Sequence, residues 1–396
     1  MKSEIEGITL PPRERPTSRP RPDHDARLDL FADDLHAKRV ASLAGAAVGV
    51  LEGAALGIHA IGKALAMAEG LKTKHAVKQV DRLLSNNGIP VWRLFASWVP
   101  FVVGDRPEIV TALDWTDFDA DNQSTIVLSM ITSHGRATPL LWKTVMKSEL
   151  KGWRNEHEDT LLERFREVLP EDVKVTVLAD RGFGDQALYE LLKDQLGLDF
   201  VVRFRGIVKV TSADGVTLAA KDRVPANGRP LLSRGARVTK TGRQVGAVVC
   251  VKAKGMKEAW HLATSHGDKA ASEIVALYGR RFTIEESFRD QKNLRFGMGL
   301  SDTRVGDPDR RDRLLLISAI AIALLTLLGA AGEAIGIDRY LKANTVKKRT
   351  ISLLNQGLMH YGALPKMKLD MLEPLMAKFG ELLREHRVFR EVFGLI

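Results

Sequence analysis

The chain has 396 residues, a hydrophobic content of 45% and a formal net charge of +10. This length suits two or three domains, or one core with insertions, and the positive charge favours a polyanionic partner, with nucleic acid ahead of an acidic membrane. The single cysteine, Cys250, excludes a disulfide framework and a cysteine-based zinc site, and with no apolar leader we expect a reducing, cytoplasmic setting.

The first hundred residues are predicted to form a tail followed by helices. Residues 1–27 are rich in Pro, Arg and Glu, a composition that cannot build a core, so we expect a flexible basic tail. Residues 28–100 have a helical pattern and are predicted to be a helical N-terminal DNA-binding region. Four basic side chains lie together in this region: Lys72, Lys74, Lys78 and Arg82. A DNA-contacting helix and a solvated basic face explain them equally well.

From residue 105 to residue 205 the pattern changes to alternating strands and helices. Strands are predicted at residues 108–118, 124–132, 137–145, 173–180 and 199–205. Helices are predicted at residues 156–169 and 185–195. The short turn at residues 133–136 predicts an antiparallel hairpin. Three strands, then helix, strand, helix and strand is the order of a mixed α/β sheet.

Residues 206–268 are predicted to be a β-rich basic insertion. The segment is rich in Gly, Lys, Arg and Val, with a turn signal at residues 213–215. Between positions 200 and 260 there are 13 Lys or Arg residues against 3 Asp or Glu residues. Because phosphate backbones are bound through such positive charge, we expect the nucleic-acid surface to be concentrated here.

A helix expected at residues 269–294 carries a distinctive set of polar side chains. Tyr278, Arg281, Glu285 and Lys292 follow the spacing Y-x2-R-x3-E-x6-K. At about 100° per residue, all four fall on one face of an α-helix. A carboxylate among phosphate-binding groups is what metal-dependent phosphodiester chemistry requires. The alternative is an exposed helix with i,i+4 charge pairs.

Two acidic residues at predicted strand ends are the best partners for Glu285. Asp114 ends the first strand and Asp180 follows the fourth, and in open α/β sheets such positions face the functional crevice. Three converging carboxylates can hold two divalent cations, for which Mg²⁺ is the natural ion. Asp117 and Asp119 compete with Asp114, although both lie in the following turn, and Asp180 has the alternative role of a turn former.

The C-terminal part, residues 331–396, is predicted to be helical. Before it, residues 314–332 form a stretch of 19 residues without a charge. That length can span a bilayer. Because it is dense in Ala and Gly and is the only such stretch, we favour a buried core helix and expect no membrane association.

These motifs resemble those of bacterial insertion-sequence transposases of the family-four type, which are DDE enzymes with an RNase H-like catalytic domain. The Y-x2-R-x3-E-x6-K signature is complete, and the Asp-Trp-Thr sequence at Asp114 and the Ala-Asp-Arg-Gly-Phe sequence at Asp180 match the other two motifs. The resemblance covers about residues 105–295. It implies an RNase H-like mixed α/β sheet built from residues 105–205 and 269–330, with the β-rich subdomain inserted and helical regions on both flanks.

The resemblance also implies roles for individual residues. Asp114, Asp180 and Glu285 would be catalytic and would bind two Mg²⁺ ions, for which Mn²⁺ can substitute. Tyr278, Arg281 and Lys292 would hold phosphates near the transposon end.

Two further residues match DNA-contacting positions of the family. In relatives that cleave through a DNA hairpin, a tryptophan at the place of Trp260 stacks on a flipped base, although a buried strand tryptophan is the plain alternative. Arg203 matches an arginine near the DNA, and Phe282 replaces a tryptophan of some members. His261, beside Trp260, is expected in the core or on the surface, with DNA contact as the alternative.

The sequence therefore predicts a DDE transposase that binds double-stranded DNA at transposon ends and target. It would cleave by two-metal hydrolysis and transfer the 3′-OH end to the target as a homodimer. The alternatives are a transposase-derived DNA-binding protein without catalysis, a structure-specific nuclease of the same fold, and a membrane protein anchored by residues 314–332.

Overall fold

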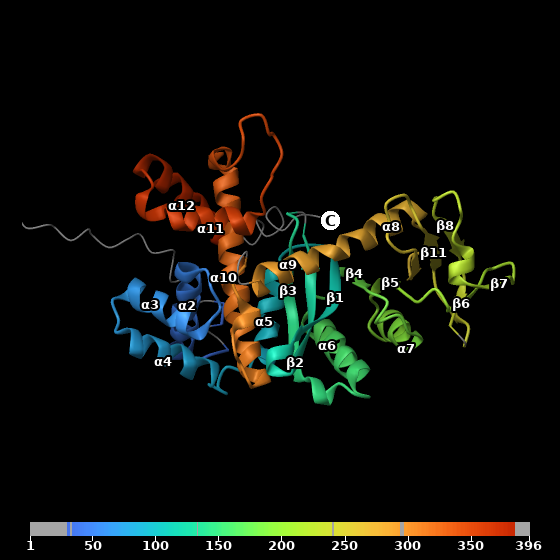
Figure 1. Ribbon diagram of the computed structural model, residues 1–396, viewed down its shortest axis with the longest axis horizontal. Coiled ribbons are helices and arrows are strands. Elements are labelled where there is room, and N and C mark those ends of the chain that lie inside the picture. Colours follow the sequence, from blue (N-terminus) through green and yellow to red (C-terminus); the bar gives the residue numbers. More distant parts are fainter. Residues whose placement is uncertain (1–29, 32–33, 133, 240, 294–296, 385–396) are drawn as a thin grey trace, which may run out of the picture.

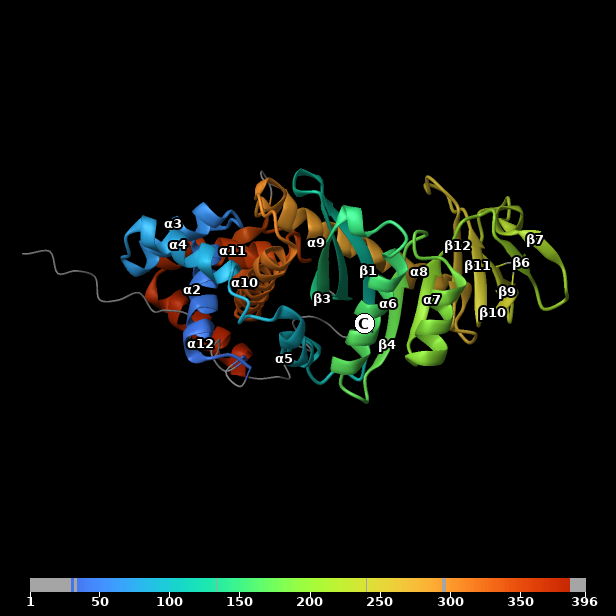
Figure 2. The same cartoon turned by 90° about the horizontal axis from the view of Figure 1, so that it is seen from below.

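The structure is a computed structural model that describes residues 30–31, 34–132, 134–239, 241–293 and 297–384. The tail predicted at residues 1–27 lies outside the described residues. The molecule is elongated: N- and C-terminal helices gather at one end, a large sheet occupies the middle, and a β-rich part forms the other end (Figures 1 and 2).

The central element is a mixed sheet, which has eight strands among the described residues in the order β3-β2-β1-β4-β5-β12-β11-β8. Strands β1, β2 and β3 form an antiparallel meander, while β4 and β5 run parallel to β1. Their bounds are Glu108–Phe118, Gln123–Ile131, Ala137–Met146, Lys174–Ala179 and Asp199–Arg203 for β1 to β5. The mixed α/β sheet of an RNase H-like fold is therefore confirmed.

The inserted segment is β-rich, and part of it belongs to the central sheet. Strand β12 pairs with β5, β11 pairs with β12, and β8 forms the far edge. Strands β10, β9, β6 and β7 make a separate small sheet. All five residues of β11 are buried, so this apolar run needs cover on both faces. The bounds are Lys209–Thr211, Thr217–Ala219, Leu231–Arg234, Arg237–Val238, Arg243–Gln244, Ala247–Val251 and Trp260–Thr264 for β6 to β12.

Alternate residues of β1 face two different cores. Ile109 and Leu113 join the core on the side of helices α5 and α6, whereas Val110 and Ala112 join the core beneath α8 and α9. This alternation directs the next even-numbered residue, Asp114, towards α9. The helices that cover the sheet are α5 Val91–Val103, α6 Arg154–Val168, α7 Gln186–Glu190, α8 Ala271–Gly279 and α9 Thr283–Lys292.

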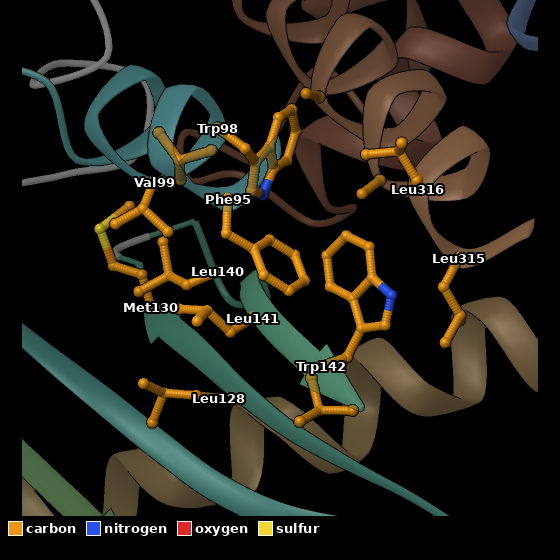
Figure 3. Packing of buried hydrophobic residues seen from close by; sticks show 14 of the residues in the cluster. Phe95, Trp98, Val99, Leu128, Met130, Leu140, Leu141, Trp142, Leu315 and Leu316 are labelled. Carbon is orange, nitrogen blue, oxygen red and sulfur yellow. The ribbon is translucent and has the colours of Figure 1, made fainter. Parts of the chain in front are cut away.

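Helix α10, Pro308–Ala334, connects the sheet to the terminal helices. It packs against β3 on one side and against helices from both ends of the chain on the others. Trp142 of β3 contacts Phe95 of α5 edge-on at 4.8 Å, and Leu315 and Leu316 of α10 complete this core (Figure 3). The terminal helices are α2 Ala37–Gly53, α3 Ile58–Glu69, α4 Thr73–Leu84, α11 Leu353–Ala363 and α12 Leu369–Arg384.

The apolar stretch predicted at residues 314–332 lies within α10. Helix α10 is long and apolar enough to cross a membrane, and so is the bent pair α2–α3 if it is taken as one span. Most of the apolar part of α10 is buried inside the protein, as in the core helix of a globular fold. The structure therefore favours the interpretation of this stretch as a core helix.

Three consecutive charged residues near the start of α10 pack against the rest of the protein: Arg311 and Arg313 are buried and Asp312 is largely enclosed. Arg311 pairs with Asp121, and Arg313 donates to the carbonyl oxygen of Leu84 at 2.8 Å. The carboxylate of Asp312 accepts a hydrogen bond at 3.1 Å from the backbone N–H of Thr144 on the edge strand β3. Burial raises the pKa of Asp312 from 3.8 to about 8.

The raised pKa of Asp312 predicts a pH-dependent stability. Between pH 3.8 and about pH 8 the folded protein keeps a proton that the unfolded chain has released, so the free energy of unfolding falls as pH rises. Asp312→Asn keeps an acceptor for Thr144 without titrating. We expect the wild type to lose at least about 2 kcal/mol relative to this variant across the window, measured by urea unfolding.

Asp309→Asn is the matched control, because Asp309 is an exposed acid on the same helix. Its pH profile should run parallel to that of the wild type. Parallel profiles for the wild type and Asp312→Asn would contradict the raised pKa.

Candidate active site

Asp114 lies near the middle of strand β1 and faces helix α9. The prediction that it ends the strand is wrong, because pairing with β2 extends β1 to Phe118. One carboxylate oxygen accepts the backbone N–H of Trp115 at 2.9 Å, and the other accepts Nη1 of Arg281 at 3.0 Å. Burial raises the pKa of Asp114 to about 6, while Arg281 opposes the rise and the charge of Asp180 adds to it. Asp114 is therefore a largely buried acid within electrostatic range of Asp180.

Asp180 follows the last residue of β4. In the parallel pairing of β1 with β4, Leu113 is opposite Ala179, so the next residues, Asp114 and Asp180, emerge at the same edge of the sheet. One oxygen of Asp180 accepts the backbone N–H of Gly182 at 2.7 Å. Asp180 therefore does form the turn, as the alternative proposed, and it also lies beside Asp114.

Glu285 reaches the same place from helix α9 through Arg281. Nη2 of Arg281 donates to Oε1 of Glu285 at 2.7 Å, while Nη1 holds Asp114. The Arg281 side chain is only 7% exposed, whereas that of Glu285 is half exposed. The guanidinium thus lies between two of the three predicted catalytic carboxylates and neutralises them.

The predicted continuous helix at residues 269–294 is interrupted. Helices α8 and α9 are joined by a 3₁₀ turn at Arg280–Phe282, which is wound more tightly than an α-helix. Lys292 nevertheless still faces β1, where its Nζ donates to Thr116 Oγ1 at 3.1 Å and to the carbonyl oxygen of Asp117 at 2.6 Å. Arg281, Glu285 and Lys292 therefore lie along one side of the site.

The structure places Tyr278 in the core, away from the exposed face. Its ring packs edge-on against Trp260 at 5.0 Å. Trp260 is half-buried and lies 5.9 Å from Phe282, which is 40% exposed. The guanidinium of Arg281 lies over the Phe282 ring at 5.1 Å. Trp260 and Phe282 thus form an aromatic group beside the site, and Tyr278 packs against Trp260 from the core.

Of the competing acids, only Asp119 lies in the turn between β1 and β2; the prediction that Asp117 also lies there is wrong, because β1 continues to Phe118 and pairs Asp117 with Ser124. Both pair with Lys147, at 3.3 Å and 2.5 Å respectively. Asp117 also accepts the hydroxyl of Ser124 at 2.8 Å. Hydrogen bonding to Lys147 lowers the pKa of Asp119. These two acids therefore act as structural partners of a surface lysine.

The donor set fits a divalent cation, but Arg281 takes part of it. Among the described residues, no three histidine, cysteine or acidic side chains are arranged to hold a metal ion together. Asp114, Asp180 and Glu285 offer the hard oxygen ligands that Mg²⁺ prefers. Burial is the main cause of the raised pKa of Asp114, and charge repulsion from Asp180, which a cation relieves, adds to it. The three carboxylates fit such an ion once Arg281 releases Asp114 and Glu285.

Two charged residues near the site were missed from the sequence. Glu158 on α6 is buried and accepts Nε1 of Trp115 at 2.7 Å, so it fixes the tryptophan of the Asp-Trp-Thr motif. Glu258 pairs with Arg203 at 2.7 Å. Local sequence offered no signal for either, because both look like ordinary surface glutamates.

Comparison with known protein families places this geometry in context. Residues 105–324 match the transposase DDE domain family. The chain belongs to this family. The match includes Asp114, Asp180 and Glu285 and leaves out the N-terminal helices and most of the C-terminal region. The search of curated proteins gave no match.

Because the chain belongs to the transposase DDE domain family, we describe the protein as a transposase. Transposase DDE domains act on DNA and generally use divalent metal ions. The carboxylates at the edge of the RNase H-like sheet are thus the candidate active site of this DDE transposase.

The counter-charge role of Arg281 predicts a large effect on stability. Arg281→Ala leaves Asp114 buried without its cation, and we expect a loss of about 2–3 kcal/mol in the free energy of unfolding. Arg289→Ala removes an exposed pair with Glu286 on the same helix and should cost under about 1 kcal/mol.

Adding Asp114→Asn to Arg281→Ala should restore part of the loss, because it removes the unpaired charge. Urea unfolding of the wild type, Arg281→Ala, Asp114→Asn and the double variant measures the coupling free energy between the two residues. Strictly additive losses would contradict it.

Proposed function

We propose that this chain is a DNA transposase of the family-four insertion-sequence type. It would bind the inverted-repeat ends of its element, cleave them hydrolytically and join the 3′-OH ends to target DNA, acting as a homodimer in the cytoplasm without membrane association. One observation carries the proposal: Asp114 and Asp180 emerge from adjacent parallel strands, and Glu285 on α9 is linked to Asp114 through Arg281.

Asp114, Asp180 and Glu285 would hold two Mg²⁺ ions, with Mn²⁺ able to replace them. When bound, such ions activate the attacking water or 3′-hydroxyl and stabilise the leaving oxygen. The half-exposed Glu285 is the ligand that moves most readily, because it is on a helix surface, whereas Asp114 is fixed within the sheet.

Arg281 and Lys292 would hold phosphates of the cleaved strand. Both are cations beside the carboxylates, and both now donate hydrogen bonds to oxygen atoms of the protein. The several oxygen atoms of a phosphate could accept these hydrogen bonds instead. If a phosphate draws Arg281 away, Asp114 and Glu285 become free to bind metal. DNA binding and metal binding would then favour one another.

The aromatic group beside the site suits an unpaired base. Phe282 is exposed and Trp260 is half-buried, so a base can stack on them while Tyr278 holds the Trp260 ring from the core. Arg203 is at the end of β5 and would contact the backbone of the same strand. Tyr278 would then support the DNA contact indirectly.

Helix α4 is the best candidate for binding duplex DNA outside the site. Ala76, Val80 and Leu83 are buried on one face. The opposite face exposes three basic side chains, Lys74, Lys78 and Arg82, and the exposed Lys72 lies just before the helix. A turn of three residues, 70–72, joins α3 to α4, a connection typical of helix-turn-helix units.

The test is cleavage of DNA that carries the imperfect inverted repeats flanking the gene. Asp114→Asn, Asp180→Asn and Glu285→Gln should each lower Mg²⁺-dependent cleavage by roughly a hundredfold or more and leave end binding within a few-fold. Gel analysis of nicked and joined products measures both reactions.

Asp117→Asn is the control, because Asp117 faces Lys147 and should leave cleavage unchanged. Binding without any cleavage by the wild type would favour a DNA-binding protein that has lost catalysis. Cleavage without joining to target DNA would favour a structure-specific nuclease.

A further inference from the structure

A basic pocket opens at the same edge of the sheet, beyond Asp180. It has a volume of about 290 Å³ and lies between the end of β5 and the start of β12. The charged and titratable side chains that line it are Arg181, Arg203, Arg205, Glu258 and His261. Arg181 directly follows Asp180 in sequence, so the pocket adjoins the candidate active site.

One carboxylate holds two of the three arginines. Oε2 of Glu258 lies 2.7 Å from Nη2 of Arg203 and 3.1 Å from Nη1 of Arg181. The guanidinium of Arg205 makes no hydrogen bond or ion pair within the described part of the chain, although its backbone carbonyl oxygen accepts the N–H of Val208 at 3.0 Å. The Glu258 side chain is 56% exposed and comes from the loop between β11 and β12. A surface carboxylate thus occupies a site with three positive charges.

Two buried nitrogen atoms at this pocket have no partner. His261 is 7% exposed, and its Nε2 makes no hydrogen bond among the described residues; the same holds for Nε of Arg203. The His261 backbone is fixed, because its carbonyl oxygen accepts the N–H of Phe204 at 2.9 Å. A buried polar atom left unpaired destabilises the protein, so a ligand that pairs with it gains affinity.

Gly206 brings the backbone close to His261. A Cβ atom at this position would lie 2.9 Å from Cε1 of His261, a contact too short for any side chain. Burial lowers the pKa of His261, and Arg203 adds to the effect. The imidazole is therefore neutral at pH 7 and can carry its proton on Nε2, where it would donate to an anion.

We propose that this pocket binds a backbone phosphate of the DNA strand that passes the active site, and that Glu258 is an internal anion which this phosphate displaces. The inference rests on the proposed function for the identity of the strand. Arg203 and Arg181 would pass from the carboxylate to the phosphate, Arg205 would add the third charge, and His261 would supply a neutral donor.

The position of the pocket fits the spacing of a DNA strand. Asp114, Asp180 and Arg203 are on the neighbouring strands β1, β4 and β5. Two gaps of about 4.8 Å separate β1 from β5, or roughly 10 Å. Because successive phosphates of one strand are at least about 3.4 Å apart, a phosphate in the pocket would lie within about three nucleotides of the reacting one.

Exchange of Glu258 for a phosphate is favourable on physical grounds. The Glu258 side chain is more than half exposed, so water can solvate its carboxylate once it leaves the two arginines, and releasing it costs little. A phosphate presents several acceptor oxygens to the two arginines at once and makes stronger charge-assisted hydrogen bonds. Glu258 therefore lowers affinity for DNA, and its removal should raise it.

The experiment compares the full-length protein with Glu258→Gln, which keeps the size of the side chain and removes its charge. Affinity for a fluorescein-labelled 30-base-pair duplex of random sequence should rise about three- to tenfold, measured by anisotropy. The thermal shift produced by inorganic phosphate on the DNA-free protein should also increase. His261→Phe should reduce that phosphate shift, with circular dichroism as the check on folding.

Glu167→Gln is the matched control. Glu167 is an exposed glutamate on α6 that pairs with Arg164, so its removal changes the net charge equally without touching the pocket. Equal affinities for DNA in the two variants would overturn the proposal. A larger phosphate shift without tighter DNA binding would overturn the assignment to a DNA strand.

Failure of this inference is separable from failure of the proposed function. Cleavage of end DNA by the wild type with no effect of Glu258→Gln would reject the pocket alone. Tighter phosphate and DNA binding by Glu258→Gln, with no cleavage of end DNA by the wild type, would reject the transposase reaction and keep the pocket.

Discussion

The parallel pairing of β1 with β4 is the constraint on which the site depends. A parallel pair brings two carboxyl ends to one edge, and the register of Leu113 with Ala179 sets the two following aspartates side by side. A shift by one residue would turn Asp114 towards the opposite core, because side chains alternate between the faces of a strand. Arg281 can balance Asp114 and Glu285 only because this register holds Asp114 towards α9.

The sequence predicted the elements of the catalytic sheet and the place of its acids. Alternating β-branched residues identified β1 to β5, because that signal is local. The expectation of acids at strand ends located Asp180 correctly, whereas Asp114 lies within β1, which continues to Phe118. The helical face that carries Glu285 was also predictable, since its spacing survives the 3₁₀ turn at Arg280–Phe282. These features depend on neighbours within a few residues in the chain.

The features that sequence did not reveal all depend on distant contacts. Arg281 meets Asp114 across 167 positions, so its role as a counter-charge could not be read from a spacing. Glu258 meets Arg203 across 55 positions. The pairing of β12 with β5, which makes the insertion part of the main sheet, likewise depends on which strand covers an open edge.

Both edge strands of the extended sheet are protected against pairing with other chains. One border is β8, only four residues long and ending in Arg234, and a short, charged strand is a poor template for a neighbouring molecule. At the opposite border, β3, helix α10 covers the edge, and the carboxylate of Asp312 accepts a hydrogen bond from the outward-directed backbone N–H of the buried Thr144. If the inserted strands were deleted, the apolar strand β5 would become a border without either protection, and self-association would compete with folding.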